Sequence, residues 1–138
     1  MSSLHLRILT PRKVVMEEDI KSITLPSVDG EITILPKHVR LFSLLKEGIV
    51  RFSNGDEKYL AIGGGYVETD GKDVHVLVSR AYGQDEIDQR ETERALDEAK
   101  KIIAETKDVS KRKEAEAILR RSVIDMKLIR RRKSRVQP

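Results

Sequence analysis

The segment at residues 24–38, TLPSVDGEITILPKH, is the feature that most limits what this chain can fold into. Its two prolines, Pro26 and Pro36, each remove a backbone donor and push the preceding residue toward extended geometry. Between them, Asp29 and Gly30 form a dipeptide that tolerates positive φ and favours a tight turn. The segment therefore predicts a strand, a tight corner and a second short strand, with the corner side chains held outward.

Residues 3–80 show the pattern of a β domain. Leu4, Leu6 and Ile8 alternate with polar residues, which is the period of a strand with one buried face. Further strands are predicted at 49–52, 59–62, 66–68 and 74–78, with turns at Asn54-Gly55 and Asp70-Gly71. Residues 41–45 fit either a strand or a helical turn. Several short strands with regular turn signals predict a β-sandwich or a flattened barrel.

The pattern changes near residue 83, where glycine and proline give way to charged helix formers, so we predict a β domain at 1–83 and a helical hairpin at 84–138. The first helix has one apolar stripe, formed by Ala95, Leu96, Ala99, Ile102 and Ile103. Asp108 or Ser110 is the expected N-cap of the second helix, which is predicted to run to about residue 132. Its main stripe is Ala115, Ile118, Leu119, Val123, Met126 and Ile129, and a smaller, nearly opposite stripe is Ala117, Ile124 and Leu128.

Two readings of the smaller stripe stay open. A helix that packs only on its neighbour needs one apolar face, so a second stripe indicates a surface that is covered part of the time. Alternatively, the stripe packs against the β domain or is simply exposed, as single apolar residues often are.

Charge is distributed unevenly along the hairpin segment. Residues 111–138 contain 11 Lys and Arg against 3 Asp and Glu, whereas residues 85–98 contain seven acids. In an antiparallel hairpin, Asp85, Glu86, Asp88 and Glu91 are expected to face Lys127, Arg130 and Arg131. Exposed pairs of this kind contribute at most about 1 kcal/mol each, so the hairpin is predicted to be loosely held.

Composition and residue spacing give no support for an enzyme. The chain has no cysteine, which excludes disulfides and thiolate chemistry. His5, His38 and His75 lie far apart without a metal-ligand spacing, so we predict no catalytic and no metal site. No stretch approaches the roughly 20 apolar residues of a membrane-spanning helix, and the N-terminus lacks an apolar signal core, so we expect a soluble, unprocessed protein.

The triple glycine Gly63-Gly64-Gly65 lacks the features of a phosphate-binding loop, because neither a Lys-Ser/Thr pair nor a helix follows it. It lies between two predicted strands, where missing side chains permit a bulge or a close approach of two chains. We therefore interpret it as structural.

Several motifs together resemble the epsilon subunits of bacterial F-type ATP synthases: LRILTP at 6–11, TLP and DGE within 24–31, ILPKH at 34–38, GGGYVE at 63–68 and DEID at 85–88. The resemblance covers nearly the whole chain, although each motif alone is weak. It implies a β-sandwich of about ten strands followed by an antiparallel two-helix hairpin. It also implies a noncatalytic rotor subunit of the central stalk, bound peripherally at the cytoplasmic face of the membrane. Such a subunit contacts gamma and the c-ring, and its hairpin inhibits ATP hydrolysis by extending toward the catalytic alpha and beta subunits.

The resemblance also implies where the partners bind. Asp29, Gly30, Glu31 and Ile32 occupy the turn that the family presents to the c-ring and to the foot of gamma, and His38 occupies its gamma-facing corner. In the hairpin, the expected regulatory contacts are made by Arg120, Arg121, Arg130 and Arg131. One departure leaves the local turn geometry open, because Thr33 stands where the family usually has glycine.

A second departure concerns ATP as a regulatory ligand. Family members that bind ATP carry Ile/Leu-Asp-x-x-Arg-Ala at the start of helix one, and this chain has Glu91 and Thr92 at the Arg-Ala positions. A carboxylate there repels phosphate. Asp88, Arg90 and Arg94 are the residues left to form a nucleotide site, but we predict no cofactor and no ATP binding.

The main alternative function is a β-sandwich module whose basic tail at residues 130–135 binds nucleic acid. The few aromatic residues all precede residue 83, which gives little support for base stacking on the tail. We therefore expect protein partners and no nucleic acid.

Overall fold

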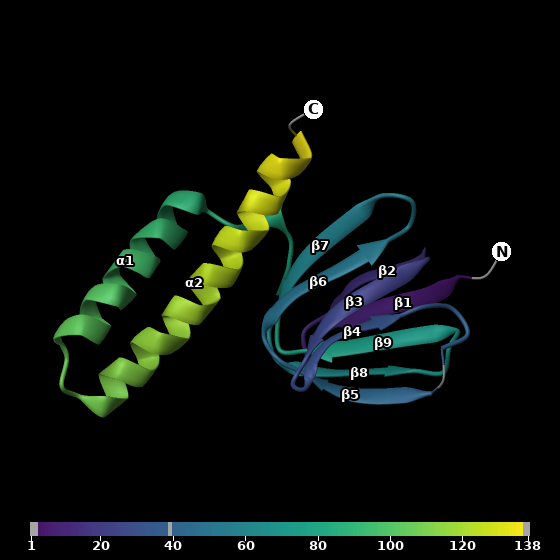
Figure 1. The fold of residues 1–138 in the computed structure, drawn as a ribbon, viewed down its shortest axis with the longest axis horizontal. Helices are drawn as coiled ribbons and strands as arrows, with labels where there is room; N and C mark the ends of the chain where they lie inside the picture. Colours follow the sequence, from purple (N-terminus) through teal and green to yellow (C-terminus); the bar gives the residue numbers. More distant parts are fainter. Residues whose placement is uncertain (1–2, 39, 137–138) are drawn as a thin grey trace. The chain divides into compact units, whose positions relative to one another are not determined.

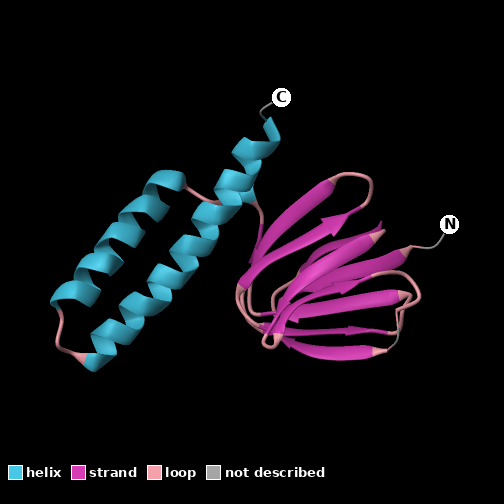
Figure 2. Cartoon of the chain, in the orientation of Figure 1, coloured by secondary structure: helices cyan, strands magenta, loops and turns pink. Residues whose placement is uncertain are grey.

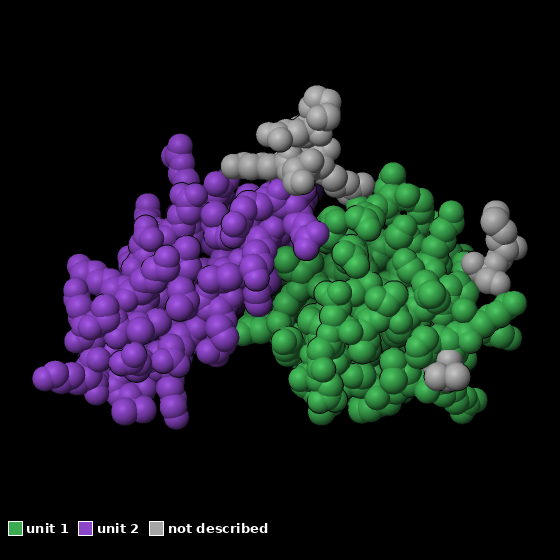
Figure 3. Space-filling model, viewed as in Figure 1, with its two compact units in different colours: residues 1–82 green, residues 83–138 purple. Residues whose placement is uncertain are grey.

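The computed structural model describes residues 3–38 and 40–136, with side chains described as far as residue 131. The chain forms two compact units, Met1–Tyr82 and Gly83–Pro138 (Figure 3). In the described part of the chain, the strands lie in the first unit and the helices in the second (Figure 2). The predicted boundary, after residue 83, lies one residue further along the chain.

The first unit is a ten-stranded sheet folded into two facing layers (Figure 1). Its strands are β1 (Leu4–Leu9), β2 (Val14–Ile20), β3 (Ser22–Ser27), β4 (Gly30–Ile34), β5 (Leu41–Leu45), β6 (Gly48–Ser53), β7 (Glu57–Ile62), β8 (Gly65–Thr69), β9 (Asp73–Val78) and β10 (Ala81–Tyr82). They follow the order β10-β7-β6-β3-β5-β8-β9-β1-β2, and β4 also pairs with β3. The layers join where Ser27 of β3 meets Leu45 of β5. This architecture confirms the predicted β-sandwich.

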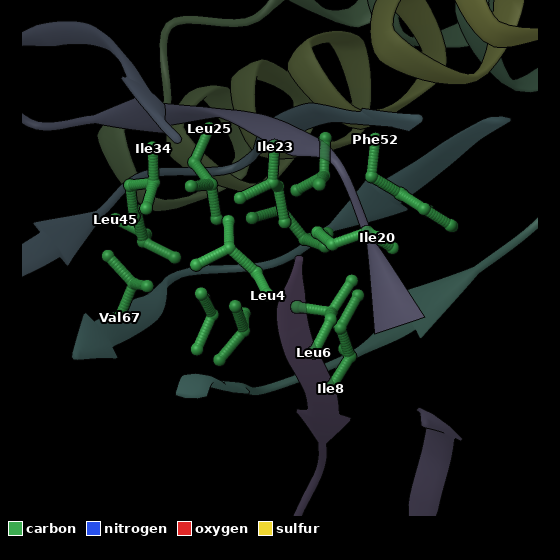
Figure 4. Packing of buried hydrophobic residues seen from close by; sticks show 14 of the residues in the cluster. Leu4, Leu6, Ile8, Ile20, Ile23, Leu25, Ile34, Leu45, Phe52 and Val67 are labelled. Carbon is green, nitrogen blue, oxygen red and sulfur yellow. The ribbon is translucent and has the colours of Figure 1, made fainter. Parts of the chain in front are cut away.

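The apolar residues that alternate along β1 belong to the buried core of the domain. Leu4, Leu6 and Ile8 are each 0% exposed, and Figure 4 shows them pointing toward the buried side chains of Ile20 and Ile23. Burial of one such side chain contributes roughly 1.5–3 kcal/mol. β1 is antiparallel to β2 and parallel to β9, so these three residues lie between one strand from the start and one from the end of the domain's sequence.

The proline-rich segment forms the predicted strand, corner and strand. Gly30 has a φ of +127° at the turn between β3 and β4, where the hydroxyl of Ser27 accepts a hydrogen bond from the Asp29 amide at 3.1 Å. The local geometry that Thr33 left open is now defined. Thr33 lies inside β4 opposite Thr24, and their hydroxyls are 2.9 Å apart, so its side chain strengthens the strand pair.

The remaining turns follow the glycine signals, and the ambiguous segment is a strand. Gly55 and Gly71 have φ values of +97° and +93° in the loops that join β6 to β7 and β8 to β9. Residues 41–45 form β5, which pairs along its whole length with β8. Pairing with a distant strand therefore decided what local sequence left open.

The second unit is an antiparallel helical hairpin, preceded by the short 3₁₀ helix η1 (Gln84–Glu86). Helix α1 (Gln89–Glu105) is capped at its N-terminus by Asp88, whose carboxylate accepts a hydrogen bond from the amide of Glu91 at 3.1 Å. Helix α2 (Val109–Val136) is capped by Asp108, one of the two predicted caps, whose carboxylate accepts the amide of Ser110 at 2.9 Å. The helix continues four residues beyond its predicted end, because no glycine or proline interrupts residues 109–136.

The apolar stripes need correction. Ile102 and Ile118 are 41% and 47% exposed, so they do not form the packed centre of the hairpin. The α2 face that packs inward follows steps of four and three residues, and the polar Ser122 lies on it with 4% exposure. This face comprises Ala115, Leu119, Ser122, Met126 and Ile129.

The smaller stripe does not behave as one surface. Ala117 is exposed, Ile124 is half-buried and Leu128 is fully buried. The side-chain amide of Gln84 donates to the carbonyl of Leu128 at 2.9 Å, which ties η1 to this part of α2. A continuous second apolar face is therefore absent from residues 117–128.

Candidate functional site

An apolar row crosses the outer face of four strands in the first unit. Leu44 lies opposite Tyr66, Tyr66 opposite Leu77, and Leu77 opposite Leu9. Residues directly opposite each other share one face of a sheet, and the inward face of these strands carries the buried neighbours Leu45, Val67, Val76, Val78 and Ile8. The four side chains therefore form a row on the outside, which we call the apolar row. Leu44 is 55% exposed and the other three are half-buried.

Two further apolar side chains widen this surface, Phe42 on β5 and Val28 beside it. Phe42 is 61% exposed, and its ring centroid lies 5.2 Å from that of Tyr66. Val28 is 54% exposed, and its amide donates to the carbonyl of Leu44 at 3.0 Å. Contiguous exposed apolar side chains on a folded domain mark interaction surfaces.

The predicted turn adjoins this surface. Asp29, Gly30 and Glu31 are exposed and Ile32 is half-buried. The hydrogen bond from the Val28 amide to the Leu44 carbonyl therefore places the turn beside the end of the apolar row.

His38 lies at a separate corner, at the opposite end of β4 from the Asp29 turn. Its amide donates to the Leu35 carbonyl at 3.1 Å, and Lys37 has a φ of +67°, which together define a type II turn with Pro36 at its second position. The amide of Lys37 donates to the carbonyl of Gly71 at 2.9 Å. A Cβ atom at Gly71 would lie 2.5 Å from the His38 carbonyl oxygen, so the β8–β9 loop packs closely against the corner.

The next rows on the same outer face are made mostly of titratable residues. Phe42, Glu68, His75, Arg7 and Glu17 follow one another across the strands, and Asp73, His5 and Asp19 form a shorter row beside them. On β1 and β2 the charges pair closely. The imidazole of His5 lies 2.6 Å from Glu17 and 2.9 Å from Asp19, and Arg7 lies 3.5 Å from Glu17.

These contacts predict a pH dependence of stability. The hydrogen bonds that the imidazole donates to the carboxylates of Asp19 and then Glu17 raise the pKa of His5 above its ordinary value. Because the pKa is higher in the folded state, the stabilisation is fully present below the unfolded pKa of about 6.5. It is lost as the pH rises through the folded pKa. We expect His5→Gln to cost more stability in urea denaturation at about pH 5.5 than at about pH 8.5. An equal cost at both pH values would contradict the assignment.

The residues considered for a nucleotide site lie at the start of α1. Asp88 is committed to capping the helix, and Glu91 adds a second carboxylate to its first turn. A helix N-terminus attracts anions, but here protein carboxylates already occupy that position. Arg90 and Arg94 are exposed nearby. The absence of ATP binding remains a prediction.

The four arginines assigned to regulation are exposed on α2. They are Arg120, Arg121, Arg130 and Arg131; the Nε of Arg130 donates to the Met126 carbonyl at 3.4 Å. The rest of the basic run, at residues 132–135, falls outside the described side chains.

The described part of the chain offers neither a metal site nor a membrane-spanning helix. Within residues 3–38 and 40–136, no group of three or more metal-ligating side chains has an arrangement suited to a metal ion. In the same residues, no helix combines the length and the apolar composition needed to cross a membrane.

Sequence reasoning missed Phe42 and Leu44. The segment LFSLL reads as a continuous apolar run, so its alternation between buried and exposed faces was not evident. Assignment of residues 41–45 to a strand would have placed Phe42 and Leu44 on one face.

Comparisons with known proteins agree with this architecture. The family model described as ATP synthase, Delta/Epsilon chain, beta-sandwich domain matches residues 3–84. The chain therefore belongs to the ATP synthase delta/epsilon chain family.

Its similar relatives in that family are epsilon chains. The ATP synthase epsilon chain of Carboxydothermus hydrogenoformans is 37% identical over 102 residues, which cover 73% of this chain and 76% of that protein. The ATP synthase epsilon chain of Herpetosiphon aurantiacus is 31% identical over 133 residues, covering 96% and 98%.

The fold is also shared with a chain in the mitochondrial ATP synthase of Euglena gracilis, solved as an OSCP/F1/c-ring assembly. The TM-score is 0.70 at 20% identity, with 99% of this chain and 83% of that chain covered.

Proposed function

We propose that this chain is the epsilon subunit of an F-type ATP synthase, a noncatalytic component of the central stalk that couples c-ring rotation to the catalytic head. The observation that carries the proposal is an exposed apolar row beside the Asp29 turn, on a domain of this family. The partners are gamma, the c-ring and the catalytic alpha and beta subunits. Association with the membrane is peripheral, through the complex at its cytoplasmic face.

The β domain suits the role of a rigid foot. Phe42 and Leu44 project from a paired strand and not from a free loop, so little conformational entropy is lost when a partner covers them. Burial of one such side chain contributes roughly 1.5–3 kcal/mol. The turn at Asp29–Ile32 is held by the Ser27 hydroxyl and the Val28 amide, and the corner at His38 by backbone hydrogen bonds, which prepares both for contacts with gamma and the c-ring.

The hairpin suits the role of a regulatory arm. Ile102 and Ile118 leave apolar area uncovered in the described hairpin, and α2 carries exposed arginines. A partner with acidic surfaces would favour an extended arm only if it binds that form better than the closed hairpin. In this proposal, the extended α2 contacts the catalytic subunits and inhibits ATP hydrolysis.

Binding to gamma tests the proposal. We expect Phe42→Ala combined with Leu44→Ala to weaken binding of the full chain to its cognate gamma subunit by roughly tenfold or more, because both side chains lose contact area. Calorimetry measures the affinity. Val109→Ala is the matched control, since Val109 is 67% exposed but lies in the hairpin. Glu31→Arg with His38→Ala then tests the turn and the corner.

The outcomes separate the candidate functions. Unchanged gamma binding by the Phe42 and Leu44 variant would reject the apolar row as the docking surface. Salt-sensitive capture of nucleic acid without gamma binding would favour the alternative module instead.

A further inference from the structure

An open groove lies directly beside the apolar row on the outer face of the β domain. Its volume is about 490 Å³. Six of its lining residues define its chemistry, and they are Arg40, Phe42, Glu68, Asp70, Asp73 and His75. Phe42 lines the groove and its ring also contacts Tyr66 of the apolar row, so a partner that covers the row at this point also reaches the groove.

The groove carries three carboxylates against one guanidinium group. Backbone amides of Asp73 and Lys72 donate to Asp70 at 2.8 and 2.9 Å, and these bonds lower the pKa of its carboxyl group. Asp70 is therefore ionised at neutral pH. Asp73 is the first residue of β9, and its side chain is exposed.

Arg40 is the basic residue among those that line the groove, so the acidic charge of the groove is in excess. Glu68 lies 3.7 Å from Nδ1 of His75. Arg40 acts on Asp70 through its charge. Lys72 is exposed on the same loop but does not line the groove.

The other half of the charged rows differs, because its acids already have cations. Glu17 lies within 4 Å of both His5 and Arg7, and Asp19 lies 2.9 Å from His5. The acidic surplus on this outer face is therefore concentrated at the groove, next to exposed aromatic area.

We propose that the groove receives a lysine or arginine side chain of the gamma subunit when gamma covers the apolar row. This inference rests on the proposed function and adds the chemistry of the partner. The aliphatic stem of the side chain lies along Phe42, and its cationic end lies between Glu68 and Asp73. The contact fixes the register of docking, because apolar contacts alone have little directional preference.

Charge complementarity selects a basic segment of a protein over the other candidates. Carboxylates at this density repel the phosphates of nucleic acids and of anionic lipids. An exposed aromatic ring beside the acids favours a long side chain with an apolar stem over a free metal ion.

The test compares two variants that each remove one negative charge from the β domain. Asp73→Asn changes the groove, whereas Asp56→Asn changes an exposed acid in the β6–β7 loop. Binding of the full-length chain to purified gamma is followed by stopped flow or surface plasmon resonance, between about 50 and about 300 mM salt.

A charge at the edge of an interface acts mainly on the association rate. We expect Asp73→Asn to slow association by roughly threefold to fivefold at low salt, and Asp73→Asn with Glu68→Gln by roughly tenfold. Both variants should show a weaker salt dependence, while Asp56→Asn matches the wild type. Thermal denaturation of each variant checks that the domain remains folded.

Each contrary outcome has a defined meaning. If the wild type binds gamma but Asp73→Asn and Asp56→Asn behave alike, the groove does not receive a basic side chain, and the proposed function stands. If only binding to the purified c-ring responds to the groove variants, the assignment to gamma is wrong. If the wild type binds no gamma at all, the proposed function fails.

Discussion

Replacing Gly65 with alanine is expected to destabilise the β domain by about 3 kcal/mol, which is a large fraction of the stability of a small domain. A Cβ atom at this position would overlap the carbonyl oxygen of Leu77 and lie 2.7 Å from Cα of Val78. Both are backbone atoms of β9, the strand that pairs with β8. The clash is therefore relieved only by moving one strand away from the other, at the expense of hydrogen bonds between them.

The neighbouring glycines supply matched controls. A Cβ at Gly64 would have its nearest contact at 3.5 Å, so Gly64→Ala is expected to change stability by less than about 1 kcal/mol. At Gly63 the obstacles are the side chains of Ser79 and Arg80, which can rotate, and an intermediate cost is expected. Urea denaturation of the three variants measures the ranking. Equal midpoints for Gly65→Ala and Gly64→Ala would show that the close approach of β8 and β9 is unimportant.

Removal of residues 111–138 is expected to raise ATP hydrolysis by the assembled complex several-fold, if α2 is the inhibitory arm proposed above. Assembly and ATP synthesis should be largely retained, because the β domain that carries the docking surface remains. Hydrolysis is measured at low ATP concentration, where inhibition is expected to be strongest.

A full-length variant separates the loss of an arm from general damage. Reversal of charge at Arg120, Arg121, Arg130 and Arg131 leaves the chain complete, and it should raise hydrolysis in the same direction as the truncation. Co-purification with gamma confirms that each complex contains the variant subunit. If the truncated and full-length complexes hydrolyse ATP equally fast, α2 is a structural appendage and the regulatory part of the proposal is wrong.

Local signals predicted the parts of the fold that local chemistry controls. Pro26 and Gly30 set backbone geometry directly, and the β3–β4 corner has the predicted form. The alternation of Leu4, Leu6 and Ile8 identified an inward face that is fully buried. The cap at Asp108 was one of two predicted candidates, and its hydrogen bonds to the next residues made the choice.

Features that depend on residues distant in the sequence were harder to predict. The apolar row joins residues from β5, β8, β9 and β1, and only the register between these strands brings them into line. In the hairpin, Ile118 was predicted to lie on the main apolar stripe of the second helix. The observed steps of four and three residues put Ser122 there instead and leave Ile118 half exposed. Relative positions of two elements decide such faces, and composition alone does not encode them.

The position of β1 also affects how the domain is made during translation. This first strand is hydrogen-bonded on one edge to β2, which follows at once, but on its other edge to β9, which begins at Asp73. The pairing of β1 with β9 can therefore form only after almost the entire domain has left the ribosome. Closure over so long a separation slows folding. The nascent chain thus presents an unpaired strand edge and exposed leucines throughout its synthesis, which is the condition under which chaperones bind and neighbouring chains associate incorrectly.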